Sequence, residues 1–304
     1  MARIFVLGSL NADLVIEVAR PPRRGETLSG GELRAHPGGK GANQAVAAAK
    51  LGGKVLMAGA LGADGYGDLL LESQRNAGVD TTHIERSHAP SGVAVITVFP
   101  DGDNSIVISP GANATLTPKF AQTALADIAK GDYLLCQLES PLETVEAALR
   151  QARAAGATTI LDLAPARDLP RSILSQVDIL TPNETEAATL LGEKKLRDPE
   201  ATALDLLTLG PRTVILKLGS KGSLTATKTG TRLRTPAFHV DVVDSTAAGD
   251  TFNAALAVAL SQGQGLAEAG RFANAAAALS VTKAGAQPST PTRAELDEFL
   301  SQSP

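Results

Sequence analysis

The residue best suited to catalysis is Asp250, in the segment DSTAAGDTFNAAL. Small residues lead through Gly249 into Asp250, and a helical pattern follows. We expect the backbone amides of Ala247, Ala248 and Gly249 to lie at a helix N-terminus, where the amides and the helix dipole attract an anion. A carboxylate beside a bound phosphoryl group can deprotonate the hydroxyl that receives it. The alternative for Asp250 is an ordinary helix cap.

A second candidate segment is HPGGKGANQAV, residues 36–46. Its glycines, Gly39 among them, let a ligand approach the backbone closely, and Lys40 and Asn43 offer polar contacts. The segment lacks the GxxxxGK[ST] spacing of a Walker A loop. The alternative is a plain loop between a strand and a helix.

Polar side chains also follow two other apolar runs. Asn11 and Asp13, in GSLNAD, alternate with apolar neighbours, so both can point to one side as the chain leaves its strand. They suit hydrogen bonds to hydroxyl groups, although such residues at strand ends are often turn formers. Glu139, after the run YLLCQL, is another carboxylate at a strand end, where it could also be simply solvated.

The segment TPNETE offers oxygen ligands after a further apolar run. Asn183 and Glu186 are three residues apart, so they share a face if a helix starts here. Such oxygens suit Mg²⁺, usually through waters. The alternative is a capping box with Asn183 as the N-cap, and both interpretations can hold together. Another Gly-rich loop, LKLGSKG, follows a strand at residues 216–222.

The composition excludes several classes of protein. The chain has 304 residues, of which 43% are hydrophobic and 3% aromatic, so its core must consist of Ala, Val, Leu and Ile. Its net charge is -4 and its basic residues are scattered, which argues against nucleic acid as a partner. The single cysteine, Cys136, excludes an internal disulfide and a cysteine-based zinc site. No stretch approaches the ~20 apolar residues of a membrane helix and the N-terminus is typical of a strand, so we expect a cytoplasmic protein.

Short apolar runs alternate with Ala-rich helical patterns along most of the chain. This alternation predicts an α/β fold with a central, mostly parallel sheet covered by helices on both faces. Ligands of such sheets bind at the carboxyl ends of the strands, so the candidate residues would gather along one rim. The expected strands are residues 4–9, 54–62, 133–138, 158–164, 177–183 and 213–219. The expected helices include residues 41–51, 66–76, 143–154, 184–191 and 200–208.

Two stretches, at about residues 12–36 and 91–110, interrupt this alternation. In the second, the turn PDGDN between VAVITV and SIVIS predicts a hairpin. We expect the short strands of both stretches to pair into a small second sheet, inserted as a lid into a single α/β domain over residues 1–304. An exposed sheet leaves edges suited to pairing with another subunit, so we also expect a homodimer through the lid sheets.

The motifs together resemble those of the ribokinase-type family of carbohydrate kinases. The resemblance runs from residue 3 to about residue 300, in the family's order. It rests on the segments GSLNAD, GGKGANQAVAAAKLG, QLESP, APAR, TPNETEA, LGSKG, DSTAAGDTFNAAL and KAGAQPS. It implies transfer of the γ-phosphoryl group of ATP to the 5-hydroxyl of D-ribose, giving D-ribose 5-phosphate and ADP, with Mg²⁺ and a monovalent cation of the K⁺ type.

The resemblance also implies a role for each matching residue. Asp250 would be the general base and the amides of residues 247–249 the anion hole. The sugar would be held by Asn11, Asp13, Gly39, Lys40, Asn43 and Glu139. The nucleotide would contact Asn183, Lys217, Leu218, Gly219, Ser220, Lys221, Gly222, Gly249 and Asn274. Glu186 would organise Mg²⁺, and the K⁺ site would draw on Asp244, Thr246, Ser280, Lys283, Gly285 and Ser289.

This sequence departs from the family's pattern at Lys217, where relatives commonly carry a small hydroxyl residue. That departure bears on the nucleotide contact of Lys217. Separately, three other acceptors compete with ribose as hypotheses: 2-deoxyribose, another small sugar or a nucleoside. A protein that senses a sugar or a nucleotide without turnover is the alternative outside the enzymes.

Overall fold

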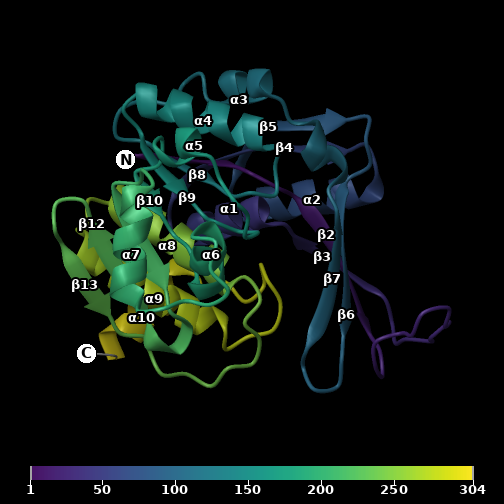
Figure 1. The fold of residues 1–304 in the computed structure, drawn as a ribbon. Helices are drawn as coiled ribbons and strands as arrows, with labels where there is room; N and C mark the ends of the chain where they lie inside the picture. Colours follow the sequence, from purple (N-terminus) through teal and green to yellow (C-terminus); the bar gives the residue numbers. More distant parts are fainter. Residues whose placement is uncertain (1, 303–304) are drawn as a thin grey trace.

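The computed structural model describes residues 2–302, and its main feature is a nine-stranded sheet (Figure 1). The strand order is β13-β12-β11-β10-β9-β8-β1-β4-β5. Pairing is parallel from β11 to β5, whereas β12 and β13 extend the sheet in antiparallel fashion. The strands are β1 (Arg3–Leu7), β4 (Lys54–Gly62), β5 (Asp80–Ser87), β8 (Tyr133–Cys136), β9 (Thr158–Leu161), β10 (Ile179–Leu180), β11 (Thr213–Lys217), β12 (Ser223–Thr227) and β13 (Arg232–Thr235).

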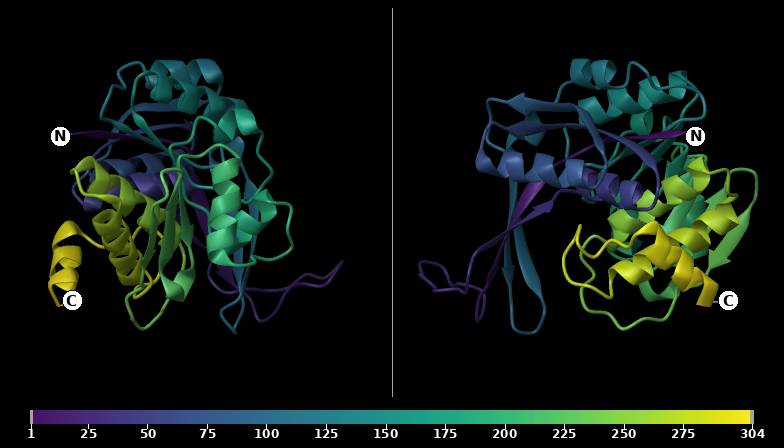
Figure 2. Two further views of the ribbon diagram at one scale, coloured as in Figure 1. Left: turned by 60° about the vertical axis from the view of Figure 1, so that its left-hand side comes forward. Right: turned by 180° about the vertical axis from the view of Figure 1, so that it is seen from behind.

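Helices cover both faces of this sheet (Figure 2), which confirms the expected α/β architecture. One face packs against α3 (Pro118–Ala124), α4 (Leu142–Ala154), α5 (Arg171–Leu174), α6 (Glu184–Leu190) and α7 (Pro199–Thr208). The other packs against α1 (Lys40–Lys50), α2 (Gly65–Asn76), α8 (Ala248–Ser261), α9 (Leu266–Ser280) and α10 (Arg293–Gln302).

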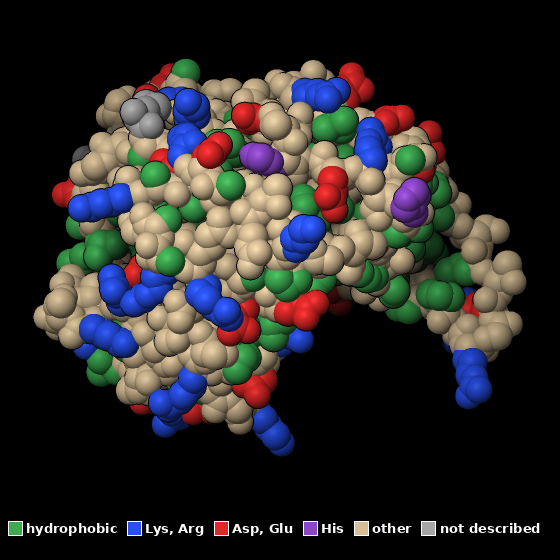
Figure 3. Space-filling view, turned by 90° about the horizontal axis from the view of Figure 1, so that it is seen from above, with side chains coloured by type: hydrophobic (Ala, Val, Ile, Leu, Met, Phe, Trp, Pro, Cys, Tyr) green, Lys and Arg blue, Asp and Glu red, His purple; other side chains and the backbone are tan. Residues whose placement is uncertain are grey.

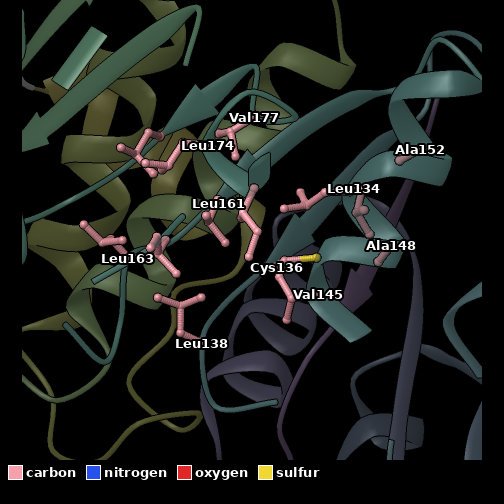
Figure 4. Packing of buried hydrophobic residues seen from close by; sticks show 14 of the residues in the cluster. Leu134, Cys136, Leu138, Val145, Ala148, Ala152, Leu161, Leu163, Leu174 and Val177 are labelled. Atoms are coloured by element: carbon pink, nitrogen blue, oxygen red, sulfur yellow. The ribbon is translucent and has the colours of Figure 1, made fainter. Parts of the chain in front are cut away.

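The core consists of small and aliphatic side chains, as the composition requires. Alanines dominate the buried faces of α1, α8 and α9, which pack on one another. On the opposite face, Figure 4 shows Leu134 and Cys136 of β8 beside Val145 and Ala148 of α4. Because alanine adds little bulk, the helices can lie close to the sheet and hold the ends of its strands in fixed positions.

A separate four-stranded sheet, called here the small sheet, has the order β3-β2-β6-β7. Its strands are β2 (Asn11–Glu17), β3 (Arg34–Gly38), β6 (Gly92–Val98) and β7 (Asn104–Ser109). The β6–β7 hairpin extends away from the large sheet (Figure 1), and the space-filling view shows a hollow beside the projecting part (Figure 3). Chain segments from both predicted insertions therefore meet in one sheet, as expected.

The element boundaries differ most from expectation where strands are short. The run at 177–183 forms only the two-residue strand β10, because Thr181 and Pro182 already belong to the loop before α6. The sequence interpretation did not anticipate the strands β5, β12 and β13 or the helices α3, α5, α9 and α10. Nothing between residues 2 and 302 forms a helix long and apolar enough to cross a membrane.

Candidate active site

Asp250 lies in the first turn of α8 and is 5% exposed. Two amides of α1 donate to its carboxylate: Asn43 Nδ2 to Oδ2 at 3.1 Å and Gln44 Nε2 to Oδ1 at 3.0 Å. Burial raises the pKa of Asp250 to about 6, with Asp162 raising it further and Lys40 opposing the rise. The carboxylate is thus oriented by fixed donors and can exchange a proton near neutral pH.

The residue before α8 has an unusual backbone. Ala247 has φ 58° and ψ 14°, in the left-handed region that residues with a Cβ seldom adopt. The amide of Ala248 donates to Ser245 O at 3.2 Å and closes the turn. This turn aims the first amides of a 14-residue helix, together with Gly249 and Asp250, at a common cavity.

The Gly-rich segment connects β3 of the small sheet to α1. Gly39 has φ 90°, and a Cβ there would lie 2.6 Å from Asn11 N. A Cβ on Gly38 would lie 2.1 Å from Asp13 Oδ2. Glycine is therefore required for the segment to pass this close to β2, and the close approach places Lys40 next to the polar residues of β2.

A cluster of polar groups surrounds Glu139, which follows β8. Its Oε2 accepts from Ser9 Oγ at 2.5 Å, from Asn11 Nδ2 at 3.3 Å and from Lys40 N at 3.3 Å. Burial raises the pKa of the neighbouring Asp13 to about 7, helped by Glu139 and Asp250 and opposed by Lys40. These groups offer hydrogen-bond donors and acceptors close together, a combination that can hold the hydroxyl groups of a polyol.

Asn113, in the 3₁₀ helix η1 (Gly111–Thr115), holds Leu10 and Asn11 of this cluster in place. It was not identified as a site residue from the sequence. It is 1% exposed, accepts from Leu10 N at 2.9 Å, and donates to Leu10 O at 3.1 Å and to Asn11 Oδ1 at 2.8 Å. Because Asn11 Oδ1 is occupied, its Nδ2 must point towards Glu139. The one signal for Asn113 was its position directly after the predicted hairpin.

Two cavities lie at this rim of the large sheet. One, of about 340 Å³, is lined by Asn11, Ile108, Asn113, Glu139 and neighbouring prolines. The other, of about 450 Å³, is lined by Lys40, Asp162, Asn183, Glu186, Lys217, Gly219, Ala247, Ala248, Gly249 and Asp250 among others. The expected convergence of strand ends is thus observed, with Lys40 and Glu139 between the two spaces.

The capping-box interpretation of TPNETE is confirmed. Asn183 caps α6, its side chain accepting from Glu186 N, while Glu186 Oε2 accepts from Asn183 N at 2.8 Å. Glu186 Oε1 also accepts from Asn183 Nδ2 at 2.8 Å. Glu186 is 7% exposed at the wall of the larger cavity, and burial raises the pKa of its carboxyl while Lys217 opposes the rise. Its oxygens fit a cation such as Mg²⁺.

The remaining residues predicted to bind the nucleotide do not all line the larger cavity. Leu218 begins the turn η2 (Gly219–Lys221), and of residues 218–222 it is Gly219 that lines the larger cavity. Asn274, 7% exposed on α9, donates to the carbonyls of Thr235 and Pro236 at 3.1 and 3.2 Å. In this structure Asn274 anchors the segment after β13.

The two segments predicted to form a K⁺ site lie side by side. Asp244 Oδ2 accepts from Gly285 N at 2.8 Å, and its Oδ1 accepts from Thr246 N at 2.9 Å. Ser280 and Ser289 bond carbonyls of their own turns, and the Lys283 ammonium pairs with Glu295 at 2.7 Å. Within residues 2–302 no group of three or more His, Cys, Asp or Glu is arranged to hold a metal. A cation between these segments would therefore have to rely on backbone carbonyl oxygens rather than on a cluster of acidic side chains.

Sequence reasoning also missed Gln44, Gln137 and Asp162. Gln44 Nε2 donates to Asp162 Oδ2 at 3.0 Å as well as to Asp250, and its Oε1 accepts from Gln137 Nε2 at 2.7 Å. Asp162 follows β9 directly, so its position at a strand end was the same signal that identified Glu139.

Comparisons with known proteins agree with this site. Residues 1–293 match the model of the pfkB family carbohydrate kinases. The chain is 44% identical to the ribokinase of Bacillus subtilis, over 99% of this chain and 100% of that protein. Its fold is similar to the ribokinase of Thermotoga maritima, with a TM-score of 0.90, 41% identity and coverage of 99% and 100% of the two chains. It is also similar to an Arabidopsis thaliana ribokinase complexed with ribose and ATP, with a TM-score of 0.89, 35% identity and 99% coverage of both chains. The chain belongs to the pfkB family of carbohydrate kinases.

Proposed function

We propose that this chain phosphorylates D-ribose at O5 with ATP, giving D-ribose 5-phosphate and ADP. The observation that carries the proposal is Asp250, a buried carboxylate in the wall of the larger cavity, at the N-terminus of α8. The relatives at 44–45% identity over nearly the whole chain are ribokinases, which supports ribose as the sugar.

In the proposed reaction, Asp250 accepts the proton of the sugar hydroxyl as that oxygen bonds to the γ-phosphorus. The bond from phosphorus to the bridging oxygen breaks, and ADP leaves with that electron pair. A positioned base contributes roughly 10²–10⁴-fold to the rate of such a step. The α8 amides offset the negative charge on the transferred group.

The polar cluster on β2 and around Glu139 supports the sugar role of Asn11, Asp13, Gly39, Lys40, Asn43 and Glu139. The Asn43 amide is held at both ends, because its Nδ2 donates to Asp250 while its Oδ1 accepts from Gln287 Nε2 at 3.2 Å. The nucleotide would occupy the larger cavity, with Mg²⁺ held near Glu186 to neutralise charge on the phosphates.

The cation site proposed at Asp244, Thr246, Ser280, Lys283, Gly285 and Ser289 adjoins the loop that begins α8. A monovalent cation bound there would order that loop without touching substrate. Replacing K⁺ in the assay buffer by tetramethylammonium should then lower kcat, and an unchanged rate would contradict the assignment.

The small sheet is proposed as a lid, since its residues Asn11 and Ile108 line the smaller cavity. Closing such a lid excludes water, which would otherwise hydrolyse ATP. Val95, Ile106 and Val107 of the small sheet are 42%, 52% and 68% exposed, and this apolar surface supports a homodimer formed through the lid sheets.

The substitution Asp250→Asn tests the proposed function. It should lower kcat for ribose by at least two orders of magnitude while ribose binding remains measurable by calorimetry. The matched control is Asp241→Asn, which neutralises an exposed carboxylate. A near-normal rate for Asp250→Asn would remove Asp250 from the role of base.

A substrate panel separates the remaining alternatives. We expect kcat/KM to be highest for D-ribose, because Asn11 and Asp13 present polar atoms to a hydroxyl-rich ligand. Preference for 2-deoxyribose or a nucleoside would replace ribose as the acceptor. Absence of any sugar-dependent ADP release would indicate a sensor rather than a kinase.

A further inference from the structure

Lys217, at the end of β11, forms a buried ion pair with Asp162, at the end of β9. Its Nζ lies 2.9 Å from Asp162 Oδ1, and the side chains are 13% and 3% exposed. An ion pair this buried is costly to form, because both charges leave water. Its presence at the wall of the larger cavity therefore calls for an explanation beyond stability.

The Lys217 ammonium lies over the first turn of α8. Its Nζ is 3.5 Å from the point where a Cβ on Gly249 would stand, so the glycine leaves room for it. The positive charge and the α8 amides therefore border the same space. An anion bound at the start of α8 would touch both.

Asp162 ties this ammonium to the base. Its Oδ1 accepts from Lys217, and its Oδ2 accepts from Gln44 Nε2 at 3.0 Å. The same Gln44 nitrogen donates to Asp250 Oδ1 at 3.0 Å. One continuous set of contacts thus fixes the distance between the Lys217 ammonium and the Asp250 carboxylate.

The charges of the larger cavity are unbalanced without Lys217. Its wall carries the carboxylates of Asp162, Glu184, Glu186 and Asp250, and the other ammonium there is that of Lys40. Burial would lower the pKa of Lys40, but the nearby carboxylates of Asp250, Asp162 and Glu139 outweigh burial and raise it. The Lys40 ammonium therefore stays charged, and its charge is already balanced by these carboxylates. A polyphosphate entering this space needs a second positive charge.

We propose that Lys217 binds the phosphates of the nucleotide and that Asp162 is its positioning residue. Lysine binds phosphate as a point charge and needs no particular plane of approach. Asp162 holds the ammonium over Gly249, where phosphate oxygens of a bound nucleotide would share it. This inference rests on the proposed use of ATP.

The competing explanation is that Lys217 merely neutralises Asp162. Removing one partner of a buried pair destabilises the fold under either explanation, so single variants do not decide between them. Removing both charges does decide. In Asp162→Asn/Lys217→Met neither charge of this pair is left buried without its partner, and most of the thermal stability lost in Lys217→Met should return.

The decisive measurement is calorimetric binding of ADP and of adenosine to wild type and to the double variant. ADP affinity should fall about 10- to 100-fold in the double variant, the effect of losing a charged hydrogen bond, while adenosine affinity should change less than twofold. Lys217→Arg, which keeps the charge, should retain most of the ADP affinity. Lys228→Met, which removes an ammonium beyond the far end of β11, is the control for net charge.

Wild-type ADP affinity in the double variant would overturn the phosphate role and leave Lys217 as a partner of Asp162 alone. An equal loss for ADP and adenosine would overturn it too, because the effect would not depend on phosphate. Failure of the wild type to bind ADP is a different result, which would contradict the proposed use of ATP itself.

Discussion

At the scale of single residues, two buried carboxylates set the pH dependence of the site. The pKa of Asp13 is raised to about 7 and that of Asp250 to about 6, chiefly by burial. In the proposed reaction, ionised Asp13 accepts a hydrogen bond from a sugar hydroxyl and ionised Asp250 takes up the proton of the reacting hydroxyl, so protonation of either carboxylate should lower activity. The kcat/KM for ribose should therefore fall below pH 7, and below pH 6 its logarithm should approach a slope of two.

The substitution Asp13→Asn separates the two groups in that pH profile. The variant should bind ribose more weakly, and its acid limb should have a slope of one with a midpoint near pH 6. Lys40→Met should move this limb to higher pH, because Lys40 lowers the pKa of Asp250. A limb that keeps its slope of two in Asp13→Asn would assign the second proton to another group.

Asn113 has a role that kinetics can isolate. Asn113→Ala leaves the buried Leu10 amide and Asn11 Oδ1 without their partner, at a cost of about 1 to 3 kcal/mol in the free energy of unfolding. With Asn11 free to turn, KM for ribose should rise about tenfold while KM for ATP stays within twofold. Asn76→Ala, at an exposed end of α2, is the control, and equal rises in both KM values would make the effect one of general stability.

The sequence revealed residues with isolated chemical signals and missed those that act through contacts. Asp250, Lys40 and Glu139 follow strands or open helices, where function is expected. Gln44 and Asn113 are ordinary amides in the sequence, and their importance depends on partners 206 and 102 residues away. Such long-range pairing cannot be inferred from one chain.

At the scale of elements, the start of α8 depends on a strained residue. Ala247 has φ 58°, which a β-branched side chain tolerates poorly, at about 1 to 3 kcal/mol. Ala247→Val should therefore shift the first turn of α8 and lower kcat at least tenfold, whereas Ala247→Gly should keep most of the activity. Equal rates for both variants would show that this backbone conformation is not needed for the reaction.

Elements with a strong periodic pattern were predictable, and short ones were not. β4 was placed at residues 54–62, as observed, and the hairpin turn PDGDN lies between β6 and β7. The strand β10 is only two residues long, although the apolar run around it is longer. Its length is set by where pairing with β9 and β11 stops, and its own sequence does not contain that information. The polar strand β5 carried no apolar run and pairs at the sheet edge with β4.

At the scale of the whole molecule, the proposed dimer should depend on the exposed apolar side chains of the small sheet. Val107→Glu places a charge where the side chain is 68% exposed, so light scattering at micromolar concentration should show a monomer where wild type shows a dimer. Leu204→Glu, at a 41% exposed position on α7, should leave the mass unchanged. A monomeric wild type would contradict the homodimer.

The rate at which a thiol reagent labels Cys136 can report ligand binding to this protein. Cys136 is the one thiol of the chain, and it is fully buried in β8 between β1 and β9. Burial also raises the pKa of this thiol. A thiol reagent should therefore modify Cys136 only when the sheet opens. Any ligand that binds the folded state reduces the open population by a factor of 1 + [L]/Kd. The rate of labelling should therefore slow by that factor as ribose or ADP is added, which would report occupancy of each cavity in variants that no longer turn over.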